Sequence, residues 1–307
     1  MRSRQTRRRA SRGEARAALL FLLPCLTGLA VFMLYPLAAN LYYSFTNFNL
    51  LNTADFIGLR NYQFMFQKDD QFWQAVRNTV LFTVIAVPLQ IVWAILVSLL
   101  VTSVKRGSSW YRTLFYLPAL LPPVAATMGF ALALHPSIGL VNRILGSLGL
   151  PKPLWLFDEN MSMWVFIAMV IWAAGNTIVV VTAGILDVPR ELYEAAMLDG
   201  SNRVQRFFFI TLPSLRPVLI FTTVTGLIGS LQLFTQPFVA NGITAGSNNV
   251  VVGAPNGASL YYTTWIYQQA FSFFHAGYAS ALSTVLFVVS MIFTLVVLRI
   301  GRFTEEP

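Results

Sequence analysis

Eight side chains in the apolar parts of this chain could contact a polar solute. Five of them carry amide or hydroxyl groups and three are aromatic: Gln90, Asn176, Thr177, Gln232, Gln236, Trp93, Trp172 and Phe234. Amides and hydroxyls match the hydroxyl groups of a sugar, and an aromatic face suits the apolar side of a sugar ring. Polar residues in helix bundles also form hydrogen bonds between helices, and that alternative stays open for each of the eight.

Groups that could catalyse a reaction are scarce. The chain has one cysteine, Cys25, and two histidines, His135 and His275, and we place all twelve carboxylates outside the apolar stretches. This set is too sparse for a catalytic triad or a metal site. No lysine follows a glycine, so a phosphate-binding loop ending in Gly-Lys-Ser or Gly-Lys-Thr is absent from the sequence. We therefore expect no enzyme, no metal site and no cofactor in this chain.

Long apolar stretches must position the eight solute-contact candidates. The composition, 56% hydrophobic and 11% charged residues, is that of a membrane protein. A helix needs about 20 apolar residues to cross the hydrocarbon core of a bilayer. Six stretches reach that length, near residues 17–44, 77–103, 113–134, 162–186, 216–240 and 277–299. The sequence therefore predicts an all-α integral membrane protein with six transmembrane helices.

The spans divide the chain into simple parts. We predict a basic tail at 1–16, a first transmembrane anchor at 17–44, an outer loop at 45–76, a core at 77–300 and a tail at 301–307. Pro118, Pro122 and Pro123 are expected to break the early part of the third span. Residues 187–215, which we call the elbow, form the one long charged interruption within the core.

The basic residues indicate the orientation. If both termini are cytoplasmic, sixteen of the twenty-one lysines and arginines lie on the inner side and five on the outer side. The positive-inside rule then places both termini and the elbow in the cytoplasm. The arginine-rich start abuts a span and has no interleaved aromatic residues, so we expect contact with membrane lipid and no nucleic-acid partner.

The elbow predicts two short helices outside the membrane. Asp187 can cap the first helix, and Gly200 can end it in a left-handed conformation. Asn202, with Gln205 three residues later, can begin the second helix, which Pro213 is expected to help end.

The residue spacing of the elbow resembles the cytoplasmic signature of permease subunits in binding-protein-dependent ABC importers. The residues that carry the resemblance are Glu194, Ala195, Ala196, Gly200, Ile210, Leu212 and Pro213. The resemblance implies a type I importer permease fold and a coupling helix that inserts into a cleft of a separate ATPase subunit. The alternative is an amphipathic loop that lies at the lipid headgroups.

Two further segments resemble the carbohydrate branch of these permeases. They are residues 56–62 and 71–79, with the sequences FIGLRNY and QFWQAVRNT. This resemblance implies a sugar importer in the inner membrane of a prokaryote. It also implies a second homologous permease, two ATPase subunits that bind ATP and Mg, and an extracytoplasmic solute-binding protein. Thr235 departs from the acidic residue that many relatives carry after a phenylalanine.

Two other functions remain as alternatives. One is an ATP-independent channel or facilitator with the same polar lining, and the other is a membrane-embedded enzyme. The channel would not need a coupling function in the elbow, whereas the enzyme would need a cluster of reactive groups that the sequence does not contain.

Overall fold

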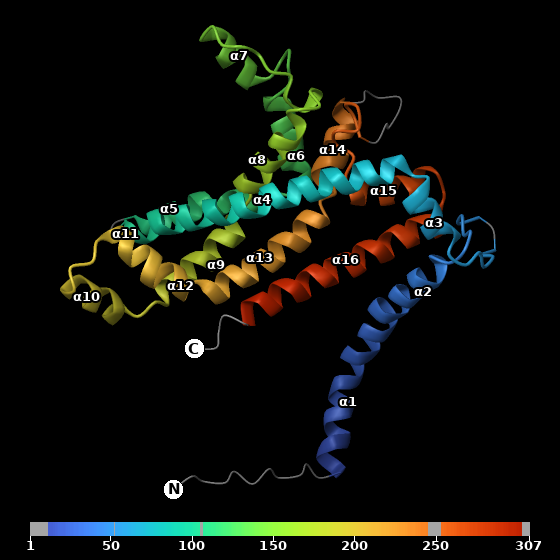
Figure 1. Cartoon of the computed structure of the whole chain (residues 1–307), viewed down its shortest axis with the longest axis horizontal. Coiled ribbons are helices and arrows are strands. Elements are labelled where there is room, and N and C mark those ends of the chain that lie inside the picture. The colour runs from blue at the N-terminus through green and yellow to red at the C-terminus, as the bar shows by residue number, and fades with distance from the viewer. Residues whose placement is uncertain (1–11, 52, 105–106, 245–252, 303–307) are drawn as a thin grey trace.

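The chain folds into helices joined by short connections. The computed structural model describes residues 12–51, 53–104, 107–244 and 253–302 (Figure 1). Within these ranges the only β-type pairing is an isolated bridge between Thr46 and Phe56, so the predicted all-α class is confirmed. The tail segments 1–11 and 303–307 and the basic pair Lys105 and Arg106 lie outside the described residues.

Four helical stretches are long and apolar enough to cross a membrane. They are Leu20–Tyr43, Asp70–Ser103, Arg216–Thr244 and Ala276–Ile300. The elements that form them are α1 (Arg12–Leu29), the π-helical turn η1 (Ala30–Leu34), α2 (Tyr35–Tyr43), α4 (Asp70–Ser103), α13 (Arg216–Leu231), α14 (Thr235–Thr244) and α16 (Ala276–Arg302). Residues 12–16, predicted as tail, belong to α1. The second span begins at Asp70 and not at 77, because Asp69 caps the helix there.

Two further spans are each broken into two helices. The third consists of α5 (Ser108–Tyr116) with η2 (Leu117–Leu120), and then α6 (Pro123–Ala133) after a bend of 96°. Leu121 and Pro122 both precede a proline and both have extended backbones, so the predicted break has its physical cause there. Counting each bent pair as one span gives six within the described residues.

The fourth span is broken as well, within the stretch predicted at 162–186. It consists of α8 (Ser162–Trp172) and α9 (Gly175–Leu186), which meet at an angle of 48°. A Cβ atom on Gly175 would lie 2.8 Å from the Cβ of Ala119 and 3.0 Å from the Cα of Tyr116. The glycine therefore lets the start of α9 pack directly against the third span.

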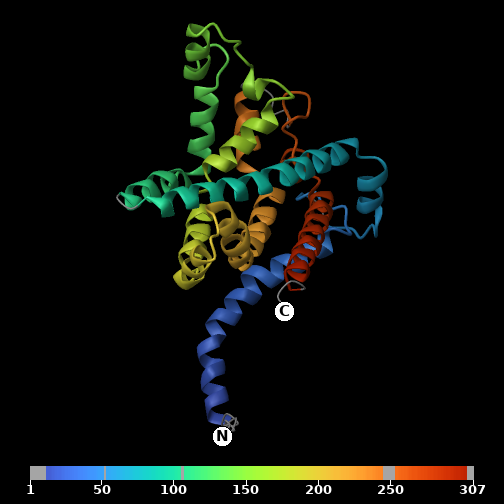
Figure 2. The same cartoon turned by 60° about the vertical axis from the view of Figure 1, so that its left-hand side comes forward.

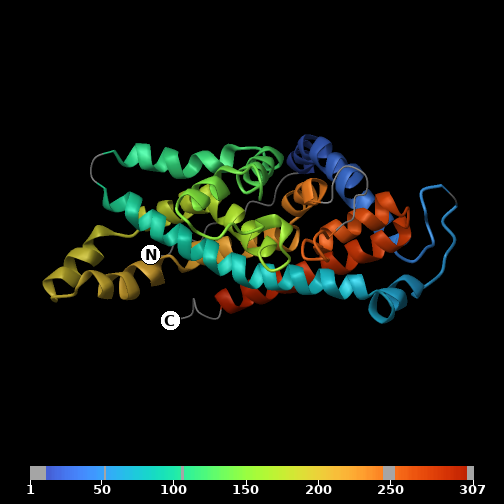
Figure 3. The same cartoon turned by 90° about the horizontal axis from the view of Figure 1, so that it is seen from above.

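Helix α4 is a long central helix against which other helices pack. Seen from above, it runs almost the whole length of the body, with the elbow near one end and α3 (Arg60–Gln67) at the other (Figure 3). Helix α3 lies inside the predicted outer loop. Val97, Val101, Val181 and Leu215 belong to one buried apolar cluster, which packs α4 against α9 and the start of α13. Inside this contact Ser98 Oγ donates to the Ile178 carbonyl at 3.1 Å, and Thr182 Oγ1 donates to Ser98 Oγ at 2.9 Å.

The first span stands apart from this body. Helix α1 extends away from the other helices, and only α2 approaches α16 (Figures 1 and 2). The Asn40 amide nitrogen donates to the Ser280 carbonyl at 3.4 Å and to Thr284 Oγ1 at 3.3 Å. None of the most apolar part of Leu20–Tyr43 is buried inside the chain.

The end of α4 opposite the elbow is closed by a buried carboxylate. Asp69 is only 7% exposed, and it accepts hydrogen bonds from the Phe72 backbone nitrogen at 3.0 Å and Trp265 Nε1 at 3.0 Å. The Tyr278 hydroxyl donates to the same side chain. We call Asp69, Trp265 and Tyr278 the Asp69 cluster. It joins α4 to α15 (Tyr262–Tyr267) and α16.

Candidate functional site

The elbow consists of two helical segments that leave the body and return to it. Helix α10 (Arg190–Leu198) forms the first, and α11 (Arg203–Arg206), the π-helical turn η4 (Phe207–Thr211) and α12 (Leu212–Ser214) form the second. Asp187 was expected to cap α10, and this was wrong. It is the C-cap of α9, and Pro189 precedes α10 without a side-chain cap. The elbow projects from one end of the body (Figures 1 and 3).

The turn between the two segments has the predicted chemistry. Gly200 has a φ of +79°, and the Ser201 nitrogen donates to the Ala196 carbonyl at 2.9 Å, so the left-handed end of α10 is confirmed. Asn202 and Gln205 form a reciprocal capping box, with both bonds at 2.8 Å. Pro213 lies inside α12, which ends one residue later at Ser214. The sequence alone thus determines the shape of the turn.

The residues predicted to contact an ATPase lie on or near the surface of the elbow. Glu194, Ala195, Gly200 and Pro213 are exposed, whereas Ala196, Ile210 and Leu212 are partly buried. Helix α10 buries none of its residues. Large apolar side chains are exposed beside them, with Leu198 90% and Phe209 79% accessible. Exposed apolar side chains of this size, gathered on one projection, are typical of a surface that another protein covers.

Three of the eight solute-contact candidates line one pocket. Trp172, Asn176 and Gln236 come from α8, α9 and α14, and they surround a cavity of about 100 Å³ at the two helix breaks. Trp172 packs edge to face against Phe130, with ring centroids 5.2 Å apart. The remaining lining is apolar except for Thr127, and none of the lining residues carries a charge. The broken spans therefore create a small, neutral, polar pocket.

The other five candidates lie elsewhere. Gln90 Nε2 donates to Thr177 Oγ1 at 3.4 Å, which joins α4 to α9 in the manner of the alternative helix-packing role. Trp93 packs against Phe115 at 6.4 Å. Phe234 stacks on Phe238 at 5.0 Å and lies 5.4 Å from Tyr267. Gln232 is exposed at the C-terminal end of α13.

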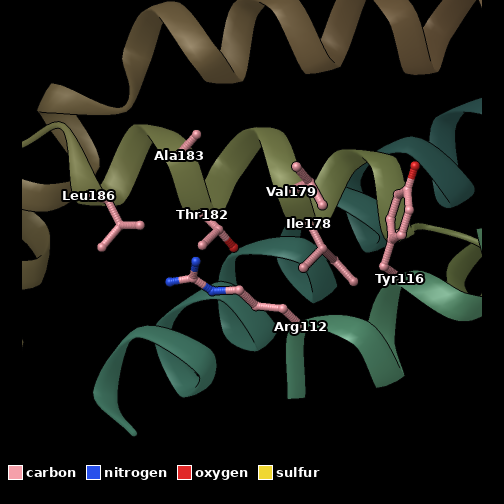
Figure 4. A pocket seen from close by; sticks show the side chains of 8 residues that line it. Arg112, Tyr116, Ile178, Val179, Thr182, Ala183 and Leu186 are labelled. Carbon is pink, nitrogen blue, oxygen red and sulfur yellow. The ribbon is translucent and has the colours of Figure 1, made fainter. Parts of the chain in front are cut away.

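A second cavity has a different character. It encloses about 170 Å³ between α5 and α9, and Arg112 is the one charged residue in its lining. Figure 4 shows the guanidinium of Arg112 lying below Thr182, with Ile178, Val179 and Leu186 along the same wall. In the sequence, Arg112 immediately precedes the third predicted span at 113–134. This cavity is cationic and apolar, whereas the pocket at Trp172 is neutral and polar.

Sequence reasoning missed the Asp69 cluster. Asp69 is separated by 196 residues from Trp265 and by 209 residues from Tyr278. An aspartate before a helix is usually a solvated cap, and the only available signal was the position of Asp69 just before the Phe72-containing segment. Nearby, burial raises the pKa of the Tyr261 and Tyr262 hydroxyls, because a buried phenolate is poorly solvated.

These features together define a class of protein. The described residues hold no group of three or more histidine, cysteine, aspartate or glutamate side chains that could bind a metal ion. The bundle has four long and two broken membrane-length helices, a neutral polar pocket and a projecting elbow. Such an arrangement is that of a multi-pass membrane protein with an exposed surface for a partner.

The comparisons with known proteins identify the family. Residues 70–304 match the model described as "Binding-protein-dependent transport system inner membrane component", and the chain belongs to this family. The family description also confirms the predicted location in the inner membrane. The chain is therefore a permease subunit, the part of an ABC transporter that is not an enzyme.

Two relatives are similar over almost the entire chain. The sulfoquinovosyl glycerol transport system permease protein of Agrobacterium fabrum is 34% identical, over 94% of this chain and 92% of the relative. The trehalose/maltose transport system permease protein of Thermococcus litoralis is 30% identical, over 95% of this chain and 96% of the relative.

A solved structure shares the fold. It is a chain of a bacterial ABC transporter involved in the import of the acidic polysaccharide alginate, with a TM-score of 0.80 and 24% identity. The likeness covers 95% of this chain and 98% of that chain. The predicted type I importer permease fold is thus confirmed.

Proposed function

We propose that this chain forms half of the translocation path of an ATP-driven importer that takes up a neutral mono- or oligosaccharide. A second homologous permease supplies the other half. Two ATPase subunits, which bind ATP and Mg, drive the cycle, and an extracytoplasmic binding protein delivers the sugar. The relatives named for sulfoquinovosyl glycerol and for trehalose and maltose support a sugar as cargo, whereas its neutrality rests on the uncharged pocket at Trp172.

The observation that carries this proposal is the exposed elbow. Its turn is fixed by Gly200 and the Asn202 capping box, and yet α10 buries none of its residues. A short helix with a defined shape and no fully buried residue makes few stabilising contacts within the chain, which leaves its exposed face for another protein. Glu194 offers a carboxylate to basic groups of that protein, and the small side chains of Ala195 and Ala196 permit close approach.

The pocket at Trp172 supports a neutral sugar as cargo. Its lining offers amides from Asn176 and Gln236, a hydroxyl from Thr127 and an aromatic face, without a charged group. Its volume of about 100 Å³ is below the roughly 300–1,000 Å³ typical of ligand sites. The pocket has a lining suited to a sugar but a small volume, as expected if it is half of a site that a second permease completes.

The distribution of basic residues supports the orientation of the chain in the membrane. With sixteen of twenty-one lysines and arginines on one side, the elbow and both termini lie in the cytoplasm. ATP-driven closure of the ATPases then moves the elbow and switches the path between outward-facing and inward-facing states.

The substitution Glu194→Arg tests this proposal. The complex is captured through a tag on this chain, and the retained ATPase is measured together with ATP-dependent uptake of radiolabelled trehalose, maltose and lactose. We expect Glu194→Arg to lower both retention and uptake about tenfold or more, because a charge reversal in a protein interface costs several kcal/mol. Glu159→Arg, an exposed change outside the elbow that removes a hydrogen bond with Asn256, should retain the ATPase.

Two results would contradict the proposal. Normal ATPase retention and uptake by Glu194→Arg would show that the elbow does not couple the subunits. Uptake that persists in vesicles without ATP would favour the facilitator. An Asn176→Ala variant distinguishes the function of the pocket from that of the elbow. It should lower sugar uptake while ATPase retention stays normal. Gln63→Ala, exposed on α3 and outside the pocket, is its control.

A further inference from the structure

We propose that the hydrogen bond between Tyr193 and Thr211 makes the elbow a single rigid body and carries force from α10 to α13. The inference rests on the proposed function, in which an ATPase moves α10. Tyr193 and Thr211 are then positioning residues for transport, and neither touches the sugar or ATP.

The bond joins the two segments of the elbow directly. The hydroxyl oxygens of Tyr193 and Thr211 are 2.8 Å apart. Thr211 Oγ1 also donates to the Arg206 carbonyl at 3.5 Å. Either hydroxyl can be the donor in the Tyr193–Thr211 bond, because each carries one hydrogen and accepts through its oxygen. Thr211 is only 4% exposed, although most of the surrounding elbow is exposed, so the bond is shielded from water.

The π-helical turn places Thr211 at this contact. Residues Phe207–Thr211 form η4, in which the repeat closes after five residues instead of four. One additional residue rotates the following side chains by roughly 100° around the helix axis. The turn thus directs Thr211 toward α10, a position that continued α-helical register would give to a neighbouring residue. Single π-helical turns are frequent at functional sites.

Thr211 is in turn fixed to the body of the protein. The Leu215 backbone nitrogen donates to the Thr211 carbonyl at 3.0 Å. Leu215 is fully buried in the apolar cluster with Val97, Val101 and Val181. The first residue of α13 follows immediately, at Arg216. A continuous series of contacts therefore leads from Tyr193 through Thr211 and Leu215 to α4, α9 and α13.

The motion of the elbow can be measured directly. Spin labels are placed at Arg190→Cys on α10 and Phe208→Cys on the second segment, in a Cys25→Ser background, and the complex with its ATPase subunits is prepared. Distances between the labels are recorded without nucleotide and with ATP plus vanadate. We expect one narrow distance distribution in both states for this background.

Removing either hydroxyl should create a second, wider spacing. In Tyr193→Phe and Thr211→Val the ratio of narrow to wide spacing should fall about fivefold, the size expected for one neutral hydrogen bond. The double variant should lose no more than either single variant, because the two hydroxyls form one bond. Thr211→Ser keeps the hydroxyl and should retain the narrow distribution, which a general packing defect at residue 211 would not allow.

The outcomes separate this inference from the proposed function. Narrow distributions in Tyr193→Phe and Thr211→Val would overturn the role of the bond, even when Glu194→Arg releases the ATPase as expected. Full ATPase retention by Glu194→Arg would overturn the proposed function, and with it the claim that this bond transmits force. A wide spacing in Thr211→Ser would also contradict the inference, since the hydroxyl is still present.

Discussion

The two ends of α4 differ in how they are held together. At the Asp69 cluster, a buried carboxylate at the start of α4 joins it to α15 and α16, which lie 196 and 209 residues further along the chain at Trp265 and Tyr278. Asn78 adds bonds from its amide nitrogen to the Gly257 carbonyl at 2.9 Å and the Leu260 carbonyl at 3.0 Å. In the elbow the side-chain bonds are local, such as those of Asn202 with Gln205 and of Tyr193 with Thr211.

This difference indicates different roles for the two ends. Long-range buried bonds fix the Asp69 end as part of the folded body, because leaving any of its donors unpaired costs free energy. The elbow has a defined shape but exposes Leu198 and Phe209. Hydrogen bonds within the elbow fix its conformation, while its exposed apolar side chains are available to a partner. Under the proposed function, the Asp69 end stabilises the fold and the elbow binds the ATPase.

The largest effect is expected at Asp69. Asp69→Ala leaves the Phe72 amide, the Trp265 indole and the Tyr278 hydroxyl without their acceptor, at a cost of about 3–5 kcal/mol in the free energy of unfolding. The midpoint of thermal unfolding of the purified chain should fall accordingly. Asp70→Ala, an exposed neighbour, should change it little. Equal effects of the two substitutions would show that the cluster does not fix this end.

An intermediate effect is expected at Gly200. Gly200 and Gly107 have φ values of +79° and +81°, and each has open space where a Cβ would lie. An alanine at either position therefore costs about 1–2 kcal/mol of backbone strain without a clash. Only Gly200→Ala should reduce ATPase retention, because only Gly200 lies in the elbow. A matching loss in Gly107→Ala would attribute the effect to stability alone.

The smallest effect is expected between the two ends. Thr182→Val removes one buried hydrogen bond to Ser98 at the contact of α4 with α9, which costs about 1 kcal/mol. The thermal midpoint should fall slightly, and ATPase retention should stay normal. A loss as large as that of Asp69→Ala would mean that polar bonds in the middle of α4 contribute as much as those at its end.

Local features of the elbow were predictable from the sequence. Gly200, Asn202 and Gln205 act through turn and cap chemistry within a few residues of the chain, and the structure has each as expected. Asp187 failed as a cap because α9 continues to Leu186 and takes Asp187 as its own C-cap. The break at Pro122 and Pro123 was likewise visible, since a proline restricts the residue before it.

Contacts between distant segments were not predictable in the same way. Nothing near Asp69 in the sequence indicates Trp265 or Tyr278, and the bend after Trp172 contains no proline. The grouping of the solute-contact candidates was also not predictable from the sequence. Apolar stretches placed Trp172, Asn176 and Gln236 in spans, but only the helix bends bring them into one pocket. Phe234, like Trp172, is an aromatic residue in a predicted span, but it packs against Phe238 outside the pocket.

A cross-link from Leu198 tests the central claim most directly. A photoreactive amino acid replaces Leu198, which is 90% exposed on α10, and the intact complex is irradiated in native membranes. We predict a cross-link to the ATPase subunit, and none to it from the same residue at Leu140, exposed on α7 (Leu140–Ser147). Cross-linking of Leu198 to lipid alone, with the ATPase joined elsewhere or absent, would contradict the account.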